Sequence, residues 1–176
     1  MTLPATLVEP GTVKLERLLP GPIERVWSYL TDSEKRAQWL AAGSFDLRVG
    51  GKVRLKFDNA SLTRDKAKAA QYGEVGKASF EGVITRLEPL RVLAHTWKWT
   101  SKGFTDDTEV TYELTPKGKQ VLLVITHRRL SKELSKAVLG GWDVHSGILA
   151  DLLEGREPRS FWDEHERVAK EYAAAA

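Results

Sequence analysis

The stretch FDLRVGGKVRLKF, residues 45–57, contains the clearest local pattern in the chain. On both sides of Gly50-Gly51, apolar residues alternate with polar or charged ones, as they do in strands with one buried face. Two glycines between two such runs are typical of a two-residue hairpin turn. The pattern therefore predicts two antiparallel strands, at 45–49 and 53–57.

The same alternation predicts further strands outward from this unit, at 13–18, 78–87, 90–100, 108–115 and 120–128. Short turns such as Pro116-Lys117-Gly118 join the later strands, and this favours antiparallel pairing. The stretch 58–77 is polar, rich in lysine and without a period, so we expect a mobile loop there. Residues 1–11 hold two prolines and a glycine and are expected to form an irregular lead-in.

Two short helices are predicted before residue 45. Apolar side chains recur at i, i+3, i+4 and i+7 from Ile23 to Leu30, directly after Pro22, a residue type common at helix starts. Thr31-Asp32-Ser33 breaks this helix and offers caps for a second one, which ends near Trp39-Leu40.

The C-terminal quarter is predicted to be helical. Ser131 is a candidate cap for a short turn that ends at Leu139-Gly140-Gly141, and a longer apolar stripe runs from Trp142 to Gly155. A final helix is expected from Ser160. Helices grouped against one antiparallel sheet indicate the α+β class.

The composition is typical of a globular cytoplasmic protein. Its 176 residues, 41% hydrophobic and 29% charged, fit one domain, which we expect to consist of a lead-in (1–11), a core (12–155) and a helical extension (156–176). The absence of cysteine excludes disulfides and thiolate metal sites. No signal peptide or membrane span is recognisable. The net charge is +3, and the basic surplus is confined to the loop-like stretch 52–77, which is a weak signal for nucleic-acid binding, so no nucleic-acid partner is expected.

Several stretches together resemble the SRPBCC superfamily, also called START-like or Bet v 1-like. Within it, the chain is similar to the branch named after the activator of heat-shock protein 90 ATPase. The similar stretches are PIERVWSYLTDSEKRAQWL (22–40), FDLRVGGKVRLKF (45–57), FEGVITRLEPLRVLAHTWKW (80–99), TEVTYELTP (108–116) and GGWDVHSGILADLLEG (140–155). The resemblance implies a helix-grip fold, in which a curved seven-stranded antiparallel sheet wraps a long C-terminal helix with a cavity between them. Members include hydrophobic-ligand carriers, polyketide cyclases, stress proteins and co-chaperone modules, so the resemblance implies no single activity.

Strand and helix periodicity place one set of side chains on the faces that the sheet and the long helix turn toward each other. This set is rich in aromatic rings and poor in charge, which is typical of a small-molecule pocket, although the same side chains could simply fill a core. The candidate ligand-binding residues are Phe57, His95, Trp97, Trp99, Tyr112, His127, Trp142, His145 and Leu149.

Three inward histidines, His95, His127 and His145, could converge on a metal ion. They come from separate elements without the spacing of a helical metal motif, and no carboxylate accompanies them, so neutral histidines with ordinary hydrogen bonds are the favoured interpretation. No metal and no cofactor are therefore expected.

We expect the protein to bind a small hydrophobic or aromatic ligand and not to act as an enzyme. One alternative is an enzyme of the polyketide cyclase or hydrolase type, in which inward histidines, for example His145 with Tyr112, act as acid and base. The other is a co-chaperone-like module that binds a partner protein.

The helix from Ser160 carries Phe161, Trp162, Val168 and Tyr172 on one side. A lone helix of about 14 residues is marginal in water, so this one is expected to dock. The candidate surfaces are the back of the N-terminal helices and a second subunit in a homodimer.

Overall fold

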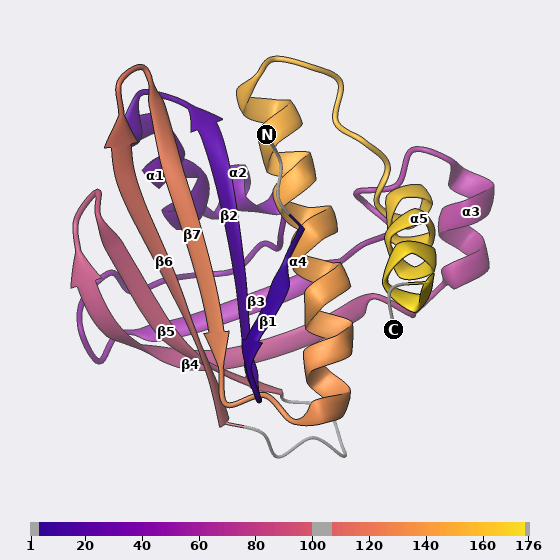
Figure 1. The fold of residues 1–176 in the computed structure, drawn as a ribbon, viewed down its shortest axis with the longest axis horizontal. Helices are drawn as coiled ribbons and strands as arrows, with labels where there is room; N and C mark the ends of the chain where they lie inside the picture. Colours follow the sequence, from indigo (N-terminus) through magenta and orange to yellow (C-terminus); the bar gives the residue numbers. More distant parts are fainter. Residues whose placement is uncertain (1–3, 100–106, 175–176) are drawn as a thin grey trace.

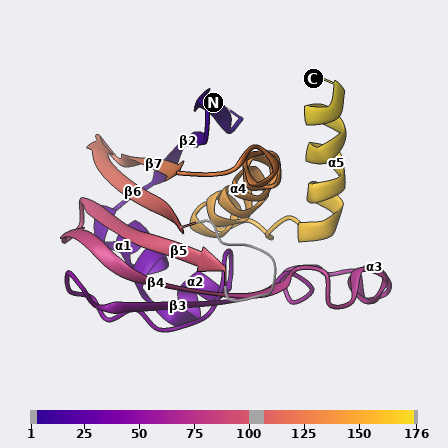
Figure 2. The ribbon, with the colours of Figure 1, turned by 90° about the horizontal axis from the view of Figure 1, so that it is seen from below.

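The computed structural model describes residues 4–99 and 107–174. A curved sheet wraps the long helix α4, and two further helices, α3 and α5, lie beyond it (Figures 1 and 2). The strands are β1 (Thr6–Glu9), β2 (Thr12–Pro20), β3 (Lys52–Asp58), β4 (Lys77–Glu88), β5 (Val92–Trp99), β6 (Asp107–Lys117) and β7 (Gln120–Arg128). The helices are α1 (Ile23–Thr31), α2 (Ser33–Ala37), α3 (Lys66–Tyr72), α4 (Lys132–Leu153) and α5 (Phe161–Ala174). This is the predicted α+β, helix-grip architecture.

The seven strands form one sheet in the order β1-β2-β7-β6-β5-β4-β3, and neighbouring strands are antiparallel. Strong curvature lets the sheet enclose α4 on its concave side (Figure 2). Most inward positions predicted by alternation are buried, as shown by Leu55, Leu93 and Ile125, each at 1% exposure or less, while Phe57 and Trp99 are partly buried. No helix formed by the described residues is long and apolar enough to cross a membrane.

The strand predicted at 45–49 does not form. Phe45 makes only an isolated bridge to Val53, and the chain turns sharply at Gly50-Gly51. A Cβ on Gly51 would lie 1.9 Å from the carbonyl oxygen of Asp46, so the backbone folds back on itself and cannot run as an extended hairpin arm. The seventh strand is instead β1, inside the lead-in predicted to be irregular, and it pairs with β2.

Helix α4 is continuous, contrary to the break predicted at Gly140-Gly141. Each interior glycine costs a helix about 0.5–1 kcal/mol relative to alanine. Burial of the apolar residues on either side offsets that cost, because Trp142 and Leu149 pack into the core. A Cβ on Gly140 would lie 3.8 Å from Val168 of α5, an ordinary van der Waals contact, so this part of α4 faces α5.

The stretch 58–77 contains helix α3, where an unstructured loop was predicted. The side chain of Asp65 caps the helix by accepting hydrogen bonds from the backbone N–H groups of Ala67 and Lys68. None of its residues is buried, which explains why no apolar period marks it in the sequence. The helix is held from outside: Tyr72 stacks on Trp162 of α5 with ring centroids 3.9 Å apart.

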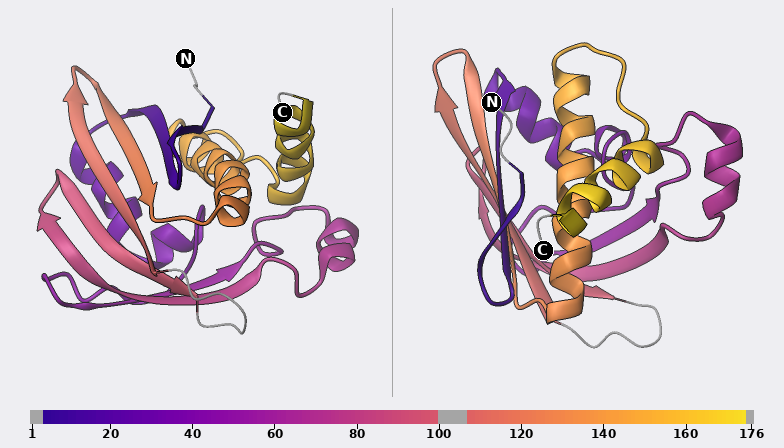
Figure 3. Two further views of the ribbon diagram at one scale, coloured as in Figure 1. Left: turned by 60° about the horizontal axis from the view of Figure 1, so that its bottom comes forward. Right: turned by 45° about the vertical axis from the view of Figure 1, so that its right-hand side comes forward.

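Helix α5 lies between α4 and α3, and not on the N-terminal helices as predicted (Figure 3, right). Lys68 of α3 forms ion pairs with two α5 carboxylates, at 2.6 Å to Asp163 and 2.8 Å to Glu166. At the other end of α5, the Tyr172 hydroxyl donates a hydrogen bond to the carboxylate of Asp143, which also forms a 2.6 Å ion pair with Arg17 of β2. The C-terminal helix is thus attached both to the core and to the segment 58–77, which is called the 58–77 excursion below.

We expect Phe161→Ala to lower the free energy of unfolding by about 3–5 kcal/mol, as truncation of a large buried aromatic does. The Phe161 side chain is 2% exposed and packs against Trp162 and His145. Chemical denaturation of the full-length protein measures the change.

The matched control is Arg167→Ala on the same helix. Arg167 forms only exposed pairs with Glu164 and Glu171, so its removal should cost less than about 0.5 kcal/mol. Equal, small losses for both variants would contradict the docked position of α5.

Candidate functional site

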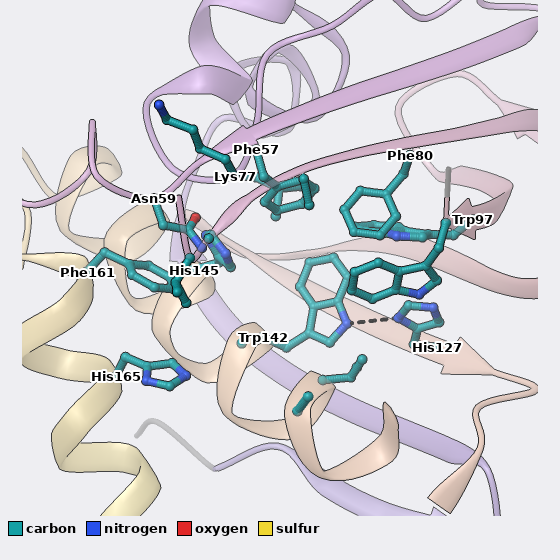
Figure 4. A pocket seen from close by; sticks show the side chains of 18 of the residues that line it. Phe57, Asn59, Lys77, Phe80, Trp97, His127, Trp142, His145, Phe161 and His165 are labelled. Carbon is teal, nitrogen blue, oxygen red and sulfur yellow. Dashed lines mark hydrogen bonds between the residues drawn. The ribbon is translucent and has the colours of Figure 1, made fainter. Parts of the chain in front are cut away.

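A cavity of about 420 Å³ lies between α4 and the sheet, and α5 and the end of the 58–77 excursion complete its wall. Strands β3, β4 and β5 contribute aromatic side chains, and α4 contributes one face that runs from Ala137 to His145. The start of α5 adds Phe161 and His165 (Figure 4), and also Trp162. The site is therefore built by the core sheet and helix together with both segments that lie outside them.

One end of the cavity consists almost entirely of aromatic rings. Phe80 meets Trp99 edge-on with centroids 4.3 Å apart, and it packs on Phe57 in the same way at 5.2 Å. Trp97 and Trp142 meet at 5.8 Å and 74°. Such edge-to-face contacts hold each ring at a fixed angle, so the rings form walls with a defined shape.

Six of the nine candidate residues line this cavity: Phe57, Trp97, Trp99, His127, Trp142 and His145. The other three lie outside the lining. His95, Tyr112 and Leu149 are at most 2% exposed and belong to the packed core. Strand and helix periodicity give the inward face for all of them, but they do not distinguish the rim of a cavity from the layer behind it.

The lining also includes residues that were not among the candidates, notably Asn59, Phe80, Phe161, Trp162 and His165. The alternation of β4 could have placed Phe80 on the inward face, because Phe80 pairs directly with the candidate residue Trp99 on β5. The other four lie on α5 or at the start of the excursion, and nothing in the sequence indicates that these segments meet at the cavity.

His127 takes part in a continuous chain of hydrogen bonds that connects α4 to the sheet. The indole N–H of Trp142 donates to its Nδ1 at 3.2 Å, so its Nε2 carries the proton and donates to Thr108 at 2.9 Å. The Thr108 hydroxyl in turn donates to the carbonyl oxygen of Trp97 at 2.8 Å. Burial lowers the pKa of His127 to about 3, which keeps the ring neutral. Both ring nitrogens are occupied, so His127 has no free position for a ligand or a metal.

His95 has a free nitrogen but no access to the cavity. Its Nδ1 lies 2.9 Å from the carbonyl oxygen of Thr96 and therefore carries the proton. Its Nε2 is buried without a hydrogen-bond partner among the described residues. Burial lowers the pKa of this ring to about 4.

His145 is the histidine whose geometry suits contact with a ligand. Its Nδ1 lies 2.7 Å from the carbonyl oxygen of Trp39, and its ring lines the cavity. Burial lowers its pKa to about 4, so the ring is neutral near pH 7.

The described residues contain no group of three His, Cys, Asp or Glu side chains placed to hold a metal ion. His95 and His127 lie on either side of Trp97, whose ring contacts both at centroid distances of 5.8 and 5.3 Å. His145 is held by the Trp39 carbonyl. The hydrogen bonds thus match the interpretation in which the three histidines are neutral.

We expect His165 to titrate first among the four histidines as the pH falls. Burial lowers its pKa as well, but the ring is only half-buried, whereas the pKa values of His95 and His145 are about 4 and that of His127 about 3. Resolved imidazole C–H signals in an NMR titration measure this order.

The same shifts predict acid destabilisation. A histidine whose pKa is about 6.5 unfolded and about 4 folded binds fewer protons in the folded state, so its stabilising contribution is complete above pH 6.5 and is lost as the pH falls toward 4. Each such group contributes a slope of at most about 1.4 kcal/mol per pH unit. A core histidine that titrates near 6.5 would contradict this account.

Comparison with known proteins connects this architecture to a family. Residues 20–154 match the family described as activator of Hsp90 ATPase homolog 1-like protein. No curated protein matches the chain. Among solved structures, the protein encoded by gene BPP1335 from Bordetella parapertussis is 37% identical, with a TM-score of 0.75, covering 96% of this chain and 87% of that one.

Two more distant structures share the fold. CalU16 from Micromonospora echinospora is 24% identical with a TM-score of 0.67, covering 93% of this chain and 86% of its own. The Aha1 dimer from Colwellia psychrerythraea is 18% identical with a TM-score of 0.59, covering 81% and 96%. Three observations agree: the family match over most of the chain, the level of identity to the Bordetella protein, and the sheet wrapped around α4. The chain therefore belongs to the activator of Hsp90 ATPase homolog 1-like branch of the SRPBCC superfamily.

Proposed function

We propose that this protein binds a small, largely apolar molecule in the cavity between α4 and the sheet. The observation that carries the proposal is the cavity itself, whose volume of about 420 Å³ is within the range of small-molecule sites. Its lining combines many aromatic rings with few polar groups, the usual composition of such sites.

The shape of α4 supports the proposal. Gly141 lies on the cavity face of the helix, and a Cβ built there would meet no atom within 4 Å. The long helix thus exposes bare backbone at a position where a side chain would occupy the space. A ligand would gain the burial of apolar surface that this space offers, about 25 cal/mol per Å².

An enzyme of the cyclase or hydrolase type is the second candidate, favoured by the free nitrogen of His145. A general base works best with a pKa near the working pH, and burial holds the pKa of His145 near 4. His127 is occupied at both nitrogens. These features favour binding over proton transfer near neutral pH. A role limited to protein–protein contact would give no reason for an aromatic cavity.

Gly141→Leu tests the binding site directly. The leucine side chain would project into the space beside Trp142, and we expect the affinity for the neutral fluorescent probe N-phenyl-1-naphthylamine to fall at least about 10-fold. The increase in probe fluorescence and the quenching of tryptophan emission measure binding to the wild type and to the variant.

Gly141→Ala is the matched control, because it adds a methyl group at the same position and improves helix propensity without filling the cavity. It should bind the probe as the wild type does. The proposal fails if the folded wild type binds no probe, or if Gly141→Leu binds it unchanged.

A further inference from the structure

We propose that the α5 end of the cavity is a hydrogen-bonding subsite in which the Nε2 atom of His145 accepts a hydrogen bond from a neutral aromatic ligand. The ligand class is a planar aromatic molecule that bears a hydroxyl or N–H group at one end, and carboxylic acids are disfavoured. The inference rests on the proposed function, because it specifies the chemistry of the molecule bound in the same cavity.

The tautomer of His145 follows from one hydrogen bond. A backbone carbonyl can only accept, so the 2.7 Å contact between Nδ1 and the oxygen of Trp39 places the proton on Nδ1. The other nitrogen, Nε2, then carries a lone pair. No described residue forms a hydrogen bond with it, and in contrast to Nε2 of His95 it is not fully enclosed. The cavity-facing group is therefore an acceptor and not a donor.

The position of this acceptor is fixed by its surroundings. The ring of His145 packs between Phe57 at 5.7 Å and Phe161 at 4.9 Å. Trp39 is fully buried, and its indole N–H donates to the carbonyl oxygen of Tyr29 at 2.9 Å. An acceptor that is already oriented loses little entropy when a ligand binds, so it favours ligands with a donor at the matching place.

The charges around the cavity disfavour an anionic ligand. The charged residues that line it are Glu74 and Lys77, and they pair with each other at 2.9 Å. His145 remains neutral because burial keeps its pKa near 4. A carboxylate placed against its lone pair would lose hydration without gaining a positive partner.

The two ends of the cavity differ in polarity, which gives a bound molecule a direction. Figure 4 shows Asn59, His145 and His165 at one end, and Phe80, Trp97 and Trp142 at the other. The ring-lined end suits a flat aromatic body, whose faces and edges match those of the surrounding rings. The hydroxyl or N–H group of the ligand would then point toward α5.

Three probes with one skeleton test the inference: naphthalene, 2-naphthol and 2-naphthoate. We expect 2-naphthol to bind about 3- to 10-fold more tightly than naphthalene, the gain from one neutral hydrogen bond, and 2-naphthoate to bind more weakly than both. Quenching of tryptophan emission by each probe at pH 7 gives the three affinities. If naphthalene and 2-naphthol bind equally, or 2-naphthoate binds most tightly, the inference is wrong while the proposed function stands. If none of the three binds, both are wrong.

His145→Phe removes the acceptor and keeps a ring. It should lose the preference for 2-naphthol, so that the ratio of the affinities for 2-naphthol and naphthalene falls to about 1. His165→Phe makes the same change at a half-buried ring on the same end of the cavity, and it should keep the preference. A preference retained in His145→Phe and lost in His165→Phe would assign the acceptor to the wrong residue.

A measurement on the wild type covers the case in which His145→Phe does not fold. Long-range ¹H–¹⁵N NMR spectra distinguish protonated from unprotonated ring nitrogens, so His145 should show a protonated Nδ1. Its Nε2 signal should move upfield with 2-naphthol and stay in place with naphthalene. A protonated Nε2, or a signal unmoved by bound 2-naphthol, overturns the inference.

Discussion

The attachment of Trp142 to the sheet is the contact on which the rest of the structure depends. Its ring packs edge-on against Trp97, and its indole N–H begins the hydrogen-bonded chain through His127 and Thr108 that ends on the backbone of β5. A polar group buried in an apolar interior is costly unless it is paired, so this chain permits one rotation of α4 about its axis. That rotation brings Gly141 and His145 to the cavity.

Helix α5 and the 58–77 excursion, which both lie outside the core sheet and α4, contact each other and complete the wall of the cavity. Helix α3 buries none of its own residues and is held through Tyr72 and Lys68, which contact α5. The stacked Tyr72 and Trp162 rings, the ion pairs of Lys68 and the hydrogen bond from Tyr72 to Glu166 together hold α3 against α5. With α5 docked, Phe161 and His165 become part of the wall. Two segments that look peripheral in the sequence thus give the cavity its polar end.

The neutral histidines of the aromatic core fix the orientation of their neighbours and also make the stability of the protein sensitive to acid. His127 and His145 each fix an orientation by hydrogen bonds that an apolar ring could not make. Burial disfavours the charged form of both, so their pKa values fall well below the ordinary value. The protein therefore gains a defined arrangement at neutral pH and loses stability as these rings are forced to accept protons.

The sequence by itself determined the local elements: the strands β2 to β7, the helices α1, α2 and α5, and the inward face that carries Trp97, Tyr112 and His127. Alternation and helical spacing reflect which side chains must leave water, and that requirement is local. The family resemblance added the wrapped helix and the expected cavity. Six of the nine candidate residues line that cavity because strand parity and helical spacing assign the correct face wherever the strand or helix is regular.

Only the tertiary structure decided the remaining features, because they depend on contacts between distant segments. The chain folds back at Gly51 and has no hairpin arm at 45–49, since the backbone of Asp46 lies against that glycine. Helix α4 passes through Gly140-Gly141 because packing outweighs the weak helix propensity of two glycines. The tautomer of His145 is set by a carbonyl 106 residues away in the chain. No periodicity encodes such a pairing, because a hydrogen bond between remote residues exists only once the fold has brought its two atoms together.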